Sequence, residues 1–222
     1  MSLLTRLAEV NDNDKNSGLS SFASAFGVVI PPSSAQVNNI DTYLATTLSD
    51  LAVRARLTLA EFVRCIRGQT DADGRPNKAL YEVPIQHNTS RRRSYELWNR
   101  IVREGVRPKW TQSKPQTQQY RPKNYKSSSA HAAAVRRHVR KSQLEGRYLV
   151  LDDRVFEMWP EEFISPVGVV EKGADDTRMI NDYSYPHGAA VNNFTDRDNF
   201  PLTILHVTLH DAFTTCVWLC LT

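Results

Sequence analysis

The sequence contains little cysteine and no long uninterrupted apolar segment. Its three cysteines, Cys65, Cys216 and Cys220, are too few and too unevenly placed for a disulfide framework, which favours a reducing, intracellular compartment. The most apolar stretch, residues 202–222, is interrupted by two histidines and an aspartate, so no membrane span is predicted. Residues 1–10 lack the continuous apolar segment of a secretory signal.

Acidic residues are scarce in the middle of the chain. Residues 86–147 contain 16 Lys and Arg against 3 Asp and Glu, a net charge of +13. Residues 1–85 carry 8 against 9, or −1, and residues 148–222 carry 4 against 12, or −8, so that the three parts sum to +4. A basic block of this kind usually faces nucleic acid or another polyanion.

The first 85 residues predict a tail followed by helices. Residues 1–36 are rich in Asn, Asp and Ser and predict a mobile tail. Residues 37–85 predict a helical hairpin region. Its first helix, over residues 39–56, has apolar residues at helical spacing, and its second begins at the capping box formed by Thr58 and Glu61 and ends at Gly68. We expect these helices to pack on each other or on a neighbouring domain without taking part in chemistry. Residues 71–74 predict a turn, because the pattern of a calcium-binding loop breaks at Arg75.

Residues 86–147 predict a basic helical connector. Helices are expected over residues 90–104 and 129–145, and the extended segment between them, residues 109–128, alternates aromatic residues with cations. Such a segment could bind nucleic acid, with its aromatic rings stacked on bases and its cations next to phosphates. It also suits a linker whose aromatic residues pack on a neighbouring domain. The candidate nucleic-acid-binding residues are Lys109, Trp110, Arg121, Lys123, Tyr125, Lys126, Arg136, Arg137, Arg140 and Lys141.

Residues 148–222 open with a short strand and continue into a predicted β-hairpin. Residues 167–170 are apolar, residues 172–176 have turn chemistry, and residues 177–182 alternate. A period of two puts Arg178, Ile180 and Asp182 on one face of the returning strand. Two neighbouring cations, Lys172 and Arg178, suit a polyanion such as a triphosphate. The same residues also suit an ordinary solvated hairpin tip.

A longer string of residues surrounds this hairpin. It reads Ser165-Pro166, Val169-Val170-Glu171-Lys172, Arg178-Met179-Ile180-Asn181-Asp182, Tyr185-Pro186-His187-Gly188 and then Val191-Asn192. This string resembles the fingers segment of reverse transcriptases from retroelements, and within them the transposon-type polymerases. The expected fold is therefore α+β, with a helical N-terminal region followed by a partial polymerase fingers subdomain that contains the β-hairpin.

The resemblance implies an RNA-directed DNA polymerase, a nucleotidyltransferase that uses Mg²⁺, a nucleic-acid template-primer and deoxynucleoside triphosphates. It implies that Lys172 and Arg178 contact the triphosphate and that Ile180 approaches the nascent base pair. Asp182 would support the hairpin or the template side. The alternative is a non-catalytic nucleic-acid-binding protein that acts through residues 86–147.

No carboxylate stands where the resemblance requires a metal ligand, so no catalytic or metal-binding residue is predicted. Asp152 and Asp153 precede the hairpin instead of following it, and Asp211 is joined directly to Ala-Phe. We therefore expect the palm to be missing and the chain alone not to polymerise. The sequence His206-x3-His210 followed by Cys216-x3-Cys220 is expected to be a chance grouping, because residues four apart on a strand are more than about 10 Å distant.

Overall fold

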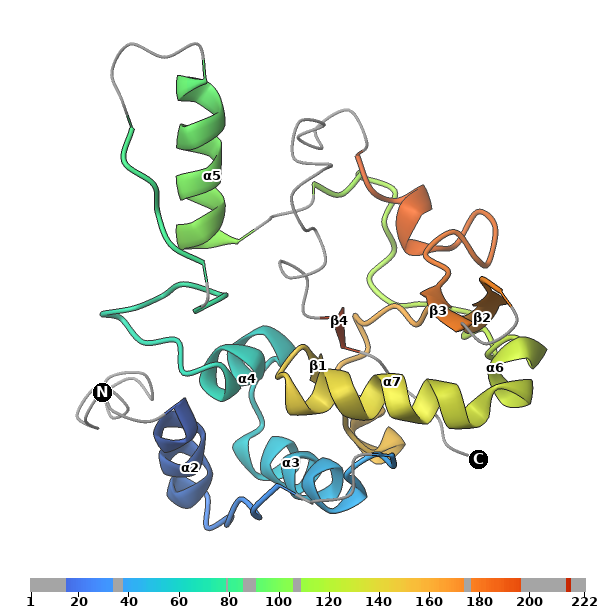
Figure 1. The fold of residues 1–222 in the computed structure, drawn as a ribbon, viewed down its shortest axis with the longest axis horizontal. Coiled ribbons are helices and arrows are strands. Elements are labelled where there is room, and N and C mark those ends of the chain that lie inside the picture. The colour runs from blue at the N-terminus through green and yellow to red at the C-terminus, as the bar shows by residue number, and fades with distance from the viewer. Residues whose placement is uncertain are drawn as a thin grey trace. The chain divides into compact units, whose positions relative to one another are not determined.

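The computed structural model describes residues 15–33, 38–78, 80–85, 91–105, 109–173, 177–196 and 215–216 (Figure 1). These form two compact units. Unit 1 contains the described residues up to 31 and those from 50 to 105. Unit 2 contains the described residues of 32–49, 109–196 and 215–216. Helices and a small antiparallel sheet make the chain an α+β protein, which confirms the predicted class.

The core of unit 1 lies between helices α2 (Lys15–Ala25) and α4 (Leu59–Ile66). The fully buried rings of Phe22 and Phe62 meet edge to face, with centroids 6.1 Å apart. Helix α2 falls within residues 1–36, and the prediction of a mobile tail did not include it. Its serines and Gly18 are weak helix formers, so it owes its stability to the packing of Phe22 on α4.

Part of helix α3 also belongs to unit 1, and a local signal fixes the start of α4. The helix predicted over residues 39–56 is α3 (Thr42–Ala55), of which residues 50–55 belong to this unit. The predicted capping box is confirmed. The Glu61 N–H donates to Thr58 Oγ1 at 3.3 Å, and the Thr58 N–H donates to Glu61 Oε2 at 3.0 Å. These bonds satisfy two amide groups that the first turn of α4 would otherwise leave open.

Helix α5 (Arg92–Glu104) confirms the helix predicted over residues 90–104 and ends at Gly105, whose φ is 76°. The extended segment 80–85 runs along it. The side-chain amide of Asn99 both accepts from the Val83 N–H and donates to the Val83 carbonyl, each at 2.9 Å. Asn99 therefore replaces the backbone partner that a strand would have given Val83, which explains why a polar residue is buried on α5.

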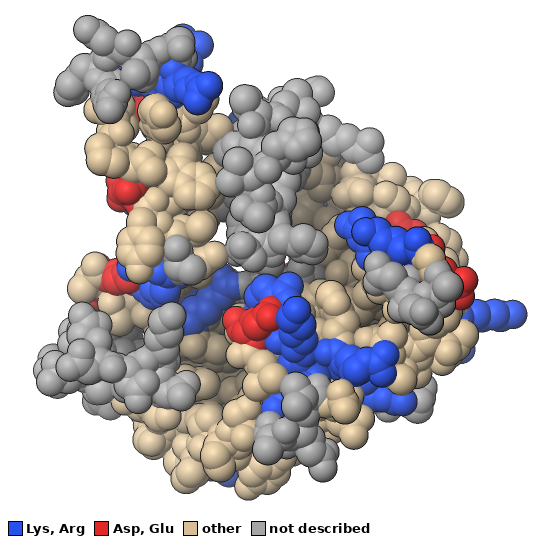
Figure 2. All heavy atoms as spheres, in the orientation of Figure 1, with Lys and Arg blue, Asp and Glu red and all other residues tan. Residues whose placement is uncertain are grey.

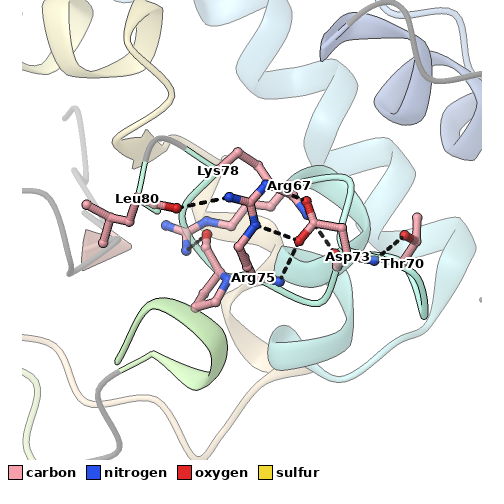
Figure 3. A network of polar contacts seen from close by, with 7 residues as sticks. Arg67, Thr70, Asp73, Arg75, Lys78 and Leu80 are labelled. Carbon is pink, nitrogen blue, oxygen red and sulfur yellow. Dashed lines mark hydrogen bonds and ion pairs between the residues drawn. The ribbon is translucent and has the colours of Figure 1, made fainter. Parts of the chain in front are cut away.

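The loop between α4 and this segment is closed by the carboxylate of Asp73 (Figure 3). Arg75 binds it with two guanidinium nitrogens at 2.9 Å each, and the Lys78 ammonium lies 2.9 Å from Oδ2. Arg75 also donates to the Leu80 carbonyl at 3.0 Å. The Arg75 guanidinium, and then Lys78, hold the pKa of Asp73 well below its usual value. The predicted turn at residues 71–74 is thus part of a larger polar network.

We predict that Asp73→Asn lowers the unfolding free energy by about 1 kcal/mol at pH 7. The loss is small because the ion pair of Asp73 with Arg75 is partly exposed to solvent. The folded-state pKa of Asp73 is lowered, so its stabilising contribution is fully present above its unfolded pKa of about 4. That contribution is lost as the pH falls toward the folded value. Urea unfolding from pH 7 to pH 2 should therefore show a shallower pH dependence for the variant, and an unchanged one would contradict the network.

Unit 2 is built on helix α7 (Ala132–Leu144), which follows the short helix α6 (Lys126–Ala130) after a break at His131. One helix over residues 129–145 was predicted, so its start and its continuity were wrong. The buried side chains of α7, Val135 and Val139, pack with a cluster from the start of α3, the segment after β1, and β2. The other buried members of this cluster are Ile40, Ala45, Val150 and Val169.

The strands of unit 2 form two separate pairs. β1 (Tyr148–Leu149) pairs in parallel with β4 (Thr215–Cys216). β2 (Val167–Glu171) and β3 (Thr177–Asn181) form the predicted antiparallel hairpin, with Val169 opposite Met179 and Val170 opposite Arg178. The described part of the turn ends at Gly173. The 3-10 helices η1 (Asp153–Met158) and η2 (Val191–Asn193) precede and follow the hairpin.

A buried ion pair joins the start of α3 to α7. Arg140 is 0% exposed and lies 3.6 Å from the carboxylate of Asp41, itself 5% exposed. Gln143 accepts from the Asp41 N–H at 3.0 Å and donates to the Asp41 carbonyl at 3.2 Å, while Asp41 caps α3 by accepting from the Leu44 N–H. The prediction that Arg140 contacts nucleic acid is therefore wrong, because its guanidinium serves the interior of unit 2.

We predict that Arg140→Leu destabilises the protein by about 3–5 kcal/mol, because it leaves the Asp41 carboxylate buried without its cation. Asp41→Asn keeps the cap and removes the charge, so the double variant Asp41→Asn, Arg140→Leu should recover part of that loss. Arg137→Leu is the matched control on the exposed side of α7 and should change stability by less than about 0.5 kcal/mol. Equal effects of the two arginine variants in urea unfolding would contradict the buried pair.

Candidate nucleic-acid interface

The end of the basic connector covers the outer edge of the β2–β3 hairpin. Asn124 Oδ1 accepts from the Val167 N–H at 2.9 Å, and Ser127 Oγ accepts from the Val169 N–H at 3.1 Å. The Tyr125 N–H donates to the Val167 carbonyl at 3.0 Å. These bonds take the place of a third strand, and α6 lies beside β2 (Figure 1). Residues 124–127 and the hairpin therefore form one structural element.

The hairpin has a buried face and an outer face. Val169 and Met179 pack toward the core, and the alternation of side chains puts Gly168, Val170, Arg178 and Ile180 on the other face. Val170 is 48% exposed and Ile180 36%. Arg178 is exposed, as is Lys172, the first residue after β2. Neither cation forms a hydrogen bond or an ion pair with any residue that the structure describes.

Tyr125 ties the connector to the far end of β3. Its hydroxyl donates to Asp182 Oδ2 at 2.6 Å, and Asp182 Oδ1 accepts from the Ser184 N–H at 2.9 Å. The Tyr125 hydroxyl, and then the Ser184 amide, lower the pKa of Asp182, and the same bond to Asp182 raises the pKa of Tyr125. Asp182 is thus an ionised anchor at the base of the hairpin.

The Tyr125 ring lies directly over Gly168. A Cβ atom at position 168 would come within 3.1 Å of Tyr125 Cδ2 and 3.4 Å of Ile180 Cγ1. A methyl group here would therefore require the Tyr125 ring to shift by a few tenths of an ångström. The ring, Gly168 and Ile180 therefore share one patch on the outer face.

Exposed cations lie just before α6, on α6 and on α7, beside this element. Lys123, Lys126, Arg136, Arg137 and Lys141 are all exposed, and within the described residues no carboxylate pairs with them. Arg137 and Lys141 are one helical turn apart and therefore share a face of α7. Figure 2 shows Lys and Arg side chains gathered over α7 and again over the hairpin. Unit 2 thus has a basic area on the connector, and two further exposed cations on a hairpin whose residues 167–182 contain four Asp and Glu and have a net charge of −2.

The remaining predicted connector residues contact their own unit. The Arg121 guanidinium lies 3.6 Å from the centroid of the Phe156 ring and pairs with Glu157 at 3.2 Å. Trp110 forms a backbone bridge with Thr195, and the Lys109 carbonyl accepts from the Asp196 N–H at 2.9 Å. Arg121 and the backbone of residues 109 and 110 are thus engaged within unit 2, whereas the Trp110 and Tyr120 side chains are 45% and 55% exposed, so both interpretations of this segment stay open.

Asn124 and Ser127 were not predicted as part of the interface. Short polar side chains just before and inside a helix normally signal a cap. Nothing local in the sequence indicates that they would instead satisfy amides of a strand more than 40 residues away. Only the docking of α6 on β2 reveals their role.

The candidate carboxylates and metal ligands form no metal centre within the described residues. Asp152 accepts from Thr46 Oγ1 at 3.3 Å and from Arg154 at 3.1 Å, and its N–H donates to Ser49, which ties the start of η1 to α3. Among the residues that the structure describes, no group of three or more His, Cys, Asp and Glu could hold a metal ion. Asp211, His206, His210 and Cys220 lie outside the described residues, and Cys216 is described only as part of β4.

No protein-family model, curated protein or solved structure matches this chain. The resemblance to reverse transcriptases thus depends on the residues around the hairpin alone. In the described part of the chain, no helix combines the length and the apolar character of a transmembrane span.

We predict that Gly168→Ala lowers the unfolding free energy by about 1 kcal/mol, because the added methyl group displaces the Tyr125 ring. In a Tyr125→Ala background the same substitution should cost little, so a double-mutant cycle in thermal unfolding should give a clear coupling energy. Purely additive effects would show that the ring does not lie on Gly168 in solution.

Proposed function

We propose that this chain is the nucleic-acid- and nucleotide-binding fingers part of a retroelement RNA-directed DNA polymerase. The observation that carries the proposal is the docking of residues 124–127 on the β2–β3 hairpin. It joins the connector cations of residues 123–141 and the cations of the hairpin in one unit. In this proposal the connector binds the phosphates of a template-primer, and the hairpin binds the triphosphate of a deoxynucleotide.

The connector has the electrostatic character that such a role requires. Residues 121–147 contain eight Lys and Arg and one acidic residue, Glu145, a net charge of +7. Arg140 and Arg121 are engaged within the protein, but Lys123, Lys126, Arg136, Arg137 and Lys141 project into solvent. Phosphates that bind there release condensed counterions, so affinity should fall steeply with salt.

The hairpin supplies a different kind of phosphate site. Arg178, the second residue of β3, offers a planar fork, and Lys172, the first residue after β2, offers a point charge, and both are exposed. The strands that carry them are held by the core contact of Val169 and Met179 and by the covered edge of β2. A compact polyanion such as a triphosphate matches two cations on a supported hairpin.

The resemblance also implies Mg²⁺ for the polymerase reaction. Among the described residues, no group of three or more His, Cys, Asp and Glu could hold that ion. The proposal is accordingly one of binding: the connector positions nucleic acid, and the hairpin positions the phosphate chain.

We predict that substitutions of the connector cations and of the hairpin cations affect the binding of different ligands by the full chain. The triple variant Arg136→Gln, Arg137→Gln, Lys141→Gln should weaken binding to a labelled oligonucleotide and reduce the slope of log K against log salt by about 2 to 3. Lys172→Gln with Arg178→Gln should mainly weaken binding of a deoxynucleoside triphosphate, measured by calorimetry. Arg64→Gln, an exposed charge change on α4, is the control that should alter neither.

The non-catalytic nucleic-acid-binding protein is the second candidate, favoured by the number of exposed cations on the connector compared with the hairpin. It predicts intact, salt-dependent oligonucleotide binding and no measurable triphosphate binding by the unaltered chain. Absence of salt-dependent binding to both RNA and DNA would exclude both candidates.

A further inference from the structure

A row of aromatic side chains extends from the connector across the base of the hairpin. The ring centroids of Tyr125 and Tyr185 are 6.1 Å apart with an interplanar angle of 53°, and Tyr185 and His187 are 6.1 Å apart at 74°. Tyr125 is 36% exposed, His187 is exposed, and Tyr185 is half-buried. The three rings come from two segments more than 50 residues apart and meet at Asp182.

The loop that carries two of these rings is held in place by its own hydrogen bonds. Ser184 donates its N–H to Asp182, and the side-chain amide of Asn192 donates to Ser184 Oγ at 2.9 Å. The Asn192 N–H also donates to the Tyr183 carbonyl at 2.9 Å. The rings therefore need little ordering when a ligand arrives, which lowers the entropic cost of binding.

The electrostatic setting of this row is asymmetric. Lys123 and Lys126 flank Tyr125 along the chain, and both are exposed. The apolar side chain of Ile180 borders the Tyr125 ring across Gly168. The ionised Asp182 carboxylate also lies at this row, 2.6 Å from the Tyr125 hydroxyl, so Lys123 and Lys126 must offset its charge. Exposed rings beside cations are the elements from which sequence-tolerant single-strand sites are built.

We infer that Tyr125, Tyr185 and His187 form a stacking surface for unpaired bases of a single nucleic-acid strand, with Lys123 and Lys126 on its phosphates. This inference rests on the proposed nucleic-acid binding and specifies its ligand as single-stranded. Duplex bases are stacked on each other and present no free faces, so a duplex can use only the cations. The tilt between the rings favours bases that lie on individual rings over bases inserted between them.

The tyrosine hydroxyl and the tyrosine ring make separable contributions. The hydroxyl holds Asp182, and the ring faces the ligand. Tyr125→Phe keeps the ring and loses the bond to Asp182, whereas Tyr125→Leu loses both. If Tyr125 acted only through its bond to Asp182, the two variants would be equally harmful, and a role of the ring in packing on Gly168 alone would weaken binding of the oligomer and of the abasic strand alike.

The test measures binding of the full chain to a single-stranded 12-nucleotide oligomer, to an abasic phosphodiester of the same length and charge, and to the corresponding duplex. We expect Tyr125→Leu and Tyr185→Leu each to weaken binding of the oligomer roughly tenfold. Binding of the abasic strand and of the duplex should stay unchanged, and Tyr125→Phe should remain close to the unaltered protein. Tyr43→Leu, which removes an exposed tyrosine on α3, is the matched control and should have no effect.

Equal losses on the oligomer and the abasic strand, or equal losses for Tyr125→Phe and Tyr125→Leu, would overturn the stacking surface while leaving the proposed function intact. Failure of the unaltered chain to bind any of the three ligands would overturn both. Circular dichroism melting of each variant shows whether it is folded, and the His187→Ala variant repeats the test at a residue that forms no bond to Asp182 among the described hydrogen bonds.

Discussion

The buried pair of Arg140 and Asp41 determines how unit 2 is assembled. A buried guanidinium costs several kcal/mol unless a counter-charge and hydrogen bonds compensate it, so α7 is stable only where Arg140 meets Asp41. Gln143 reinforces that position through the backbone of Asp41. Once α7 is placed in this way, Val139 faces the core and Arg137 faces solvent. The exposed basic surface is thus a consequence of where one cation is buried.

A second constraint on the structure of unit 2 is that the edge of β2 must be covered. A two-stranded hairpin is marginal in water, and here the missing third strand is replaced by Asn124, the Tyr125 backbone and Ser127. The connector and the hairpin, which charge and periodicity divide at about residue 147, are therefore stabilised together. A ligand on Lys123 or Lys126 binds next to residues that hold the hairpin.

Structural features that depend on a few neighbouring residues could be predicted from the sequence. Features that depend on contacts between distant residues could not. Thr58 and Glu61 specify the start of α4 within four residues, and alternation over residues 177–181 specifies β3. Arg140, in contrast, has the same local pattern as Arg136 and Arg137, and only Asp41, 99 positions earlier, separates them. Likewise, Phe22 stabilises α2 through Phe62, which no local pattern of serines and glycine could indicate.

An ionised carboxylate within a polyanion-binding surface would ordinarily weaken binding, and the geometry of β3 limits that effect. Asp182 and Arg178 are four residues apart on an extended chain, about 13 Å at the usual rise of about 3.3 Å per residue. This exceeds the Debye length of about 8 Å at physiological salt, so screening protects a ligand on Arg178 from the charge of Asp182. Asp182 can thus anchor Tyr125 in its ionised form without repelling phosphates at the hairpin tip. Glu171, Asp175 and Asp176 stand nearer to Lys172 and Arg178 in the sequence, so they, and not Asp182, are the carboxylates that oppose a polyanion at the tip.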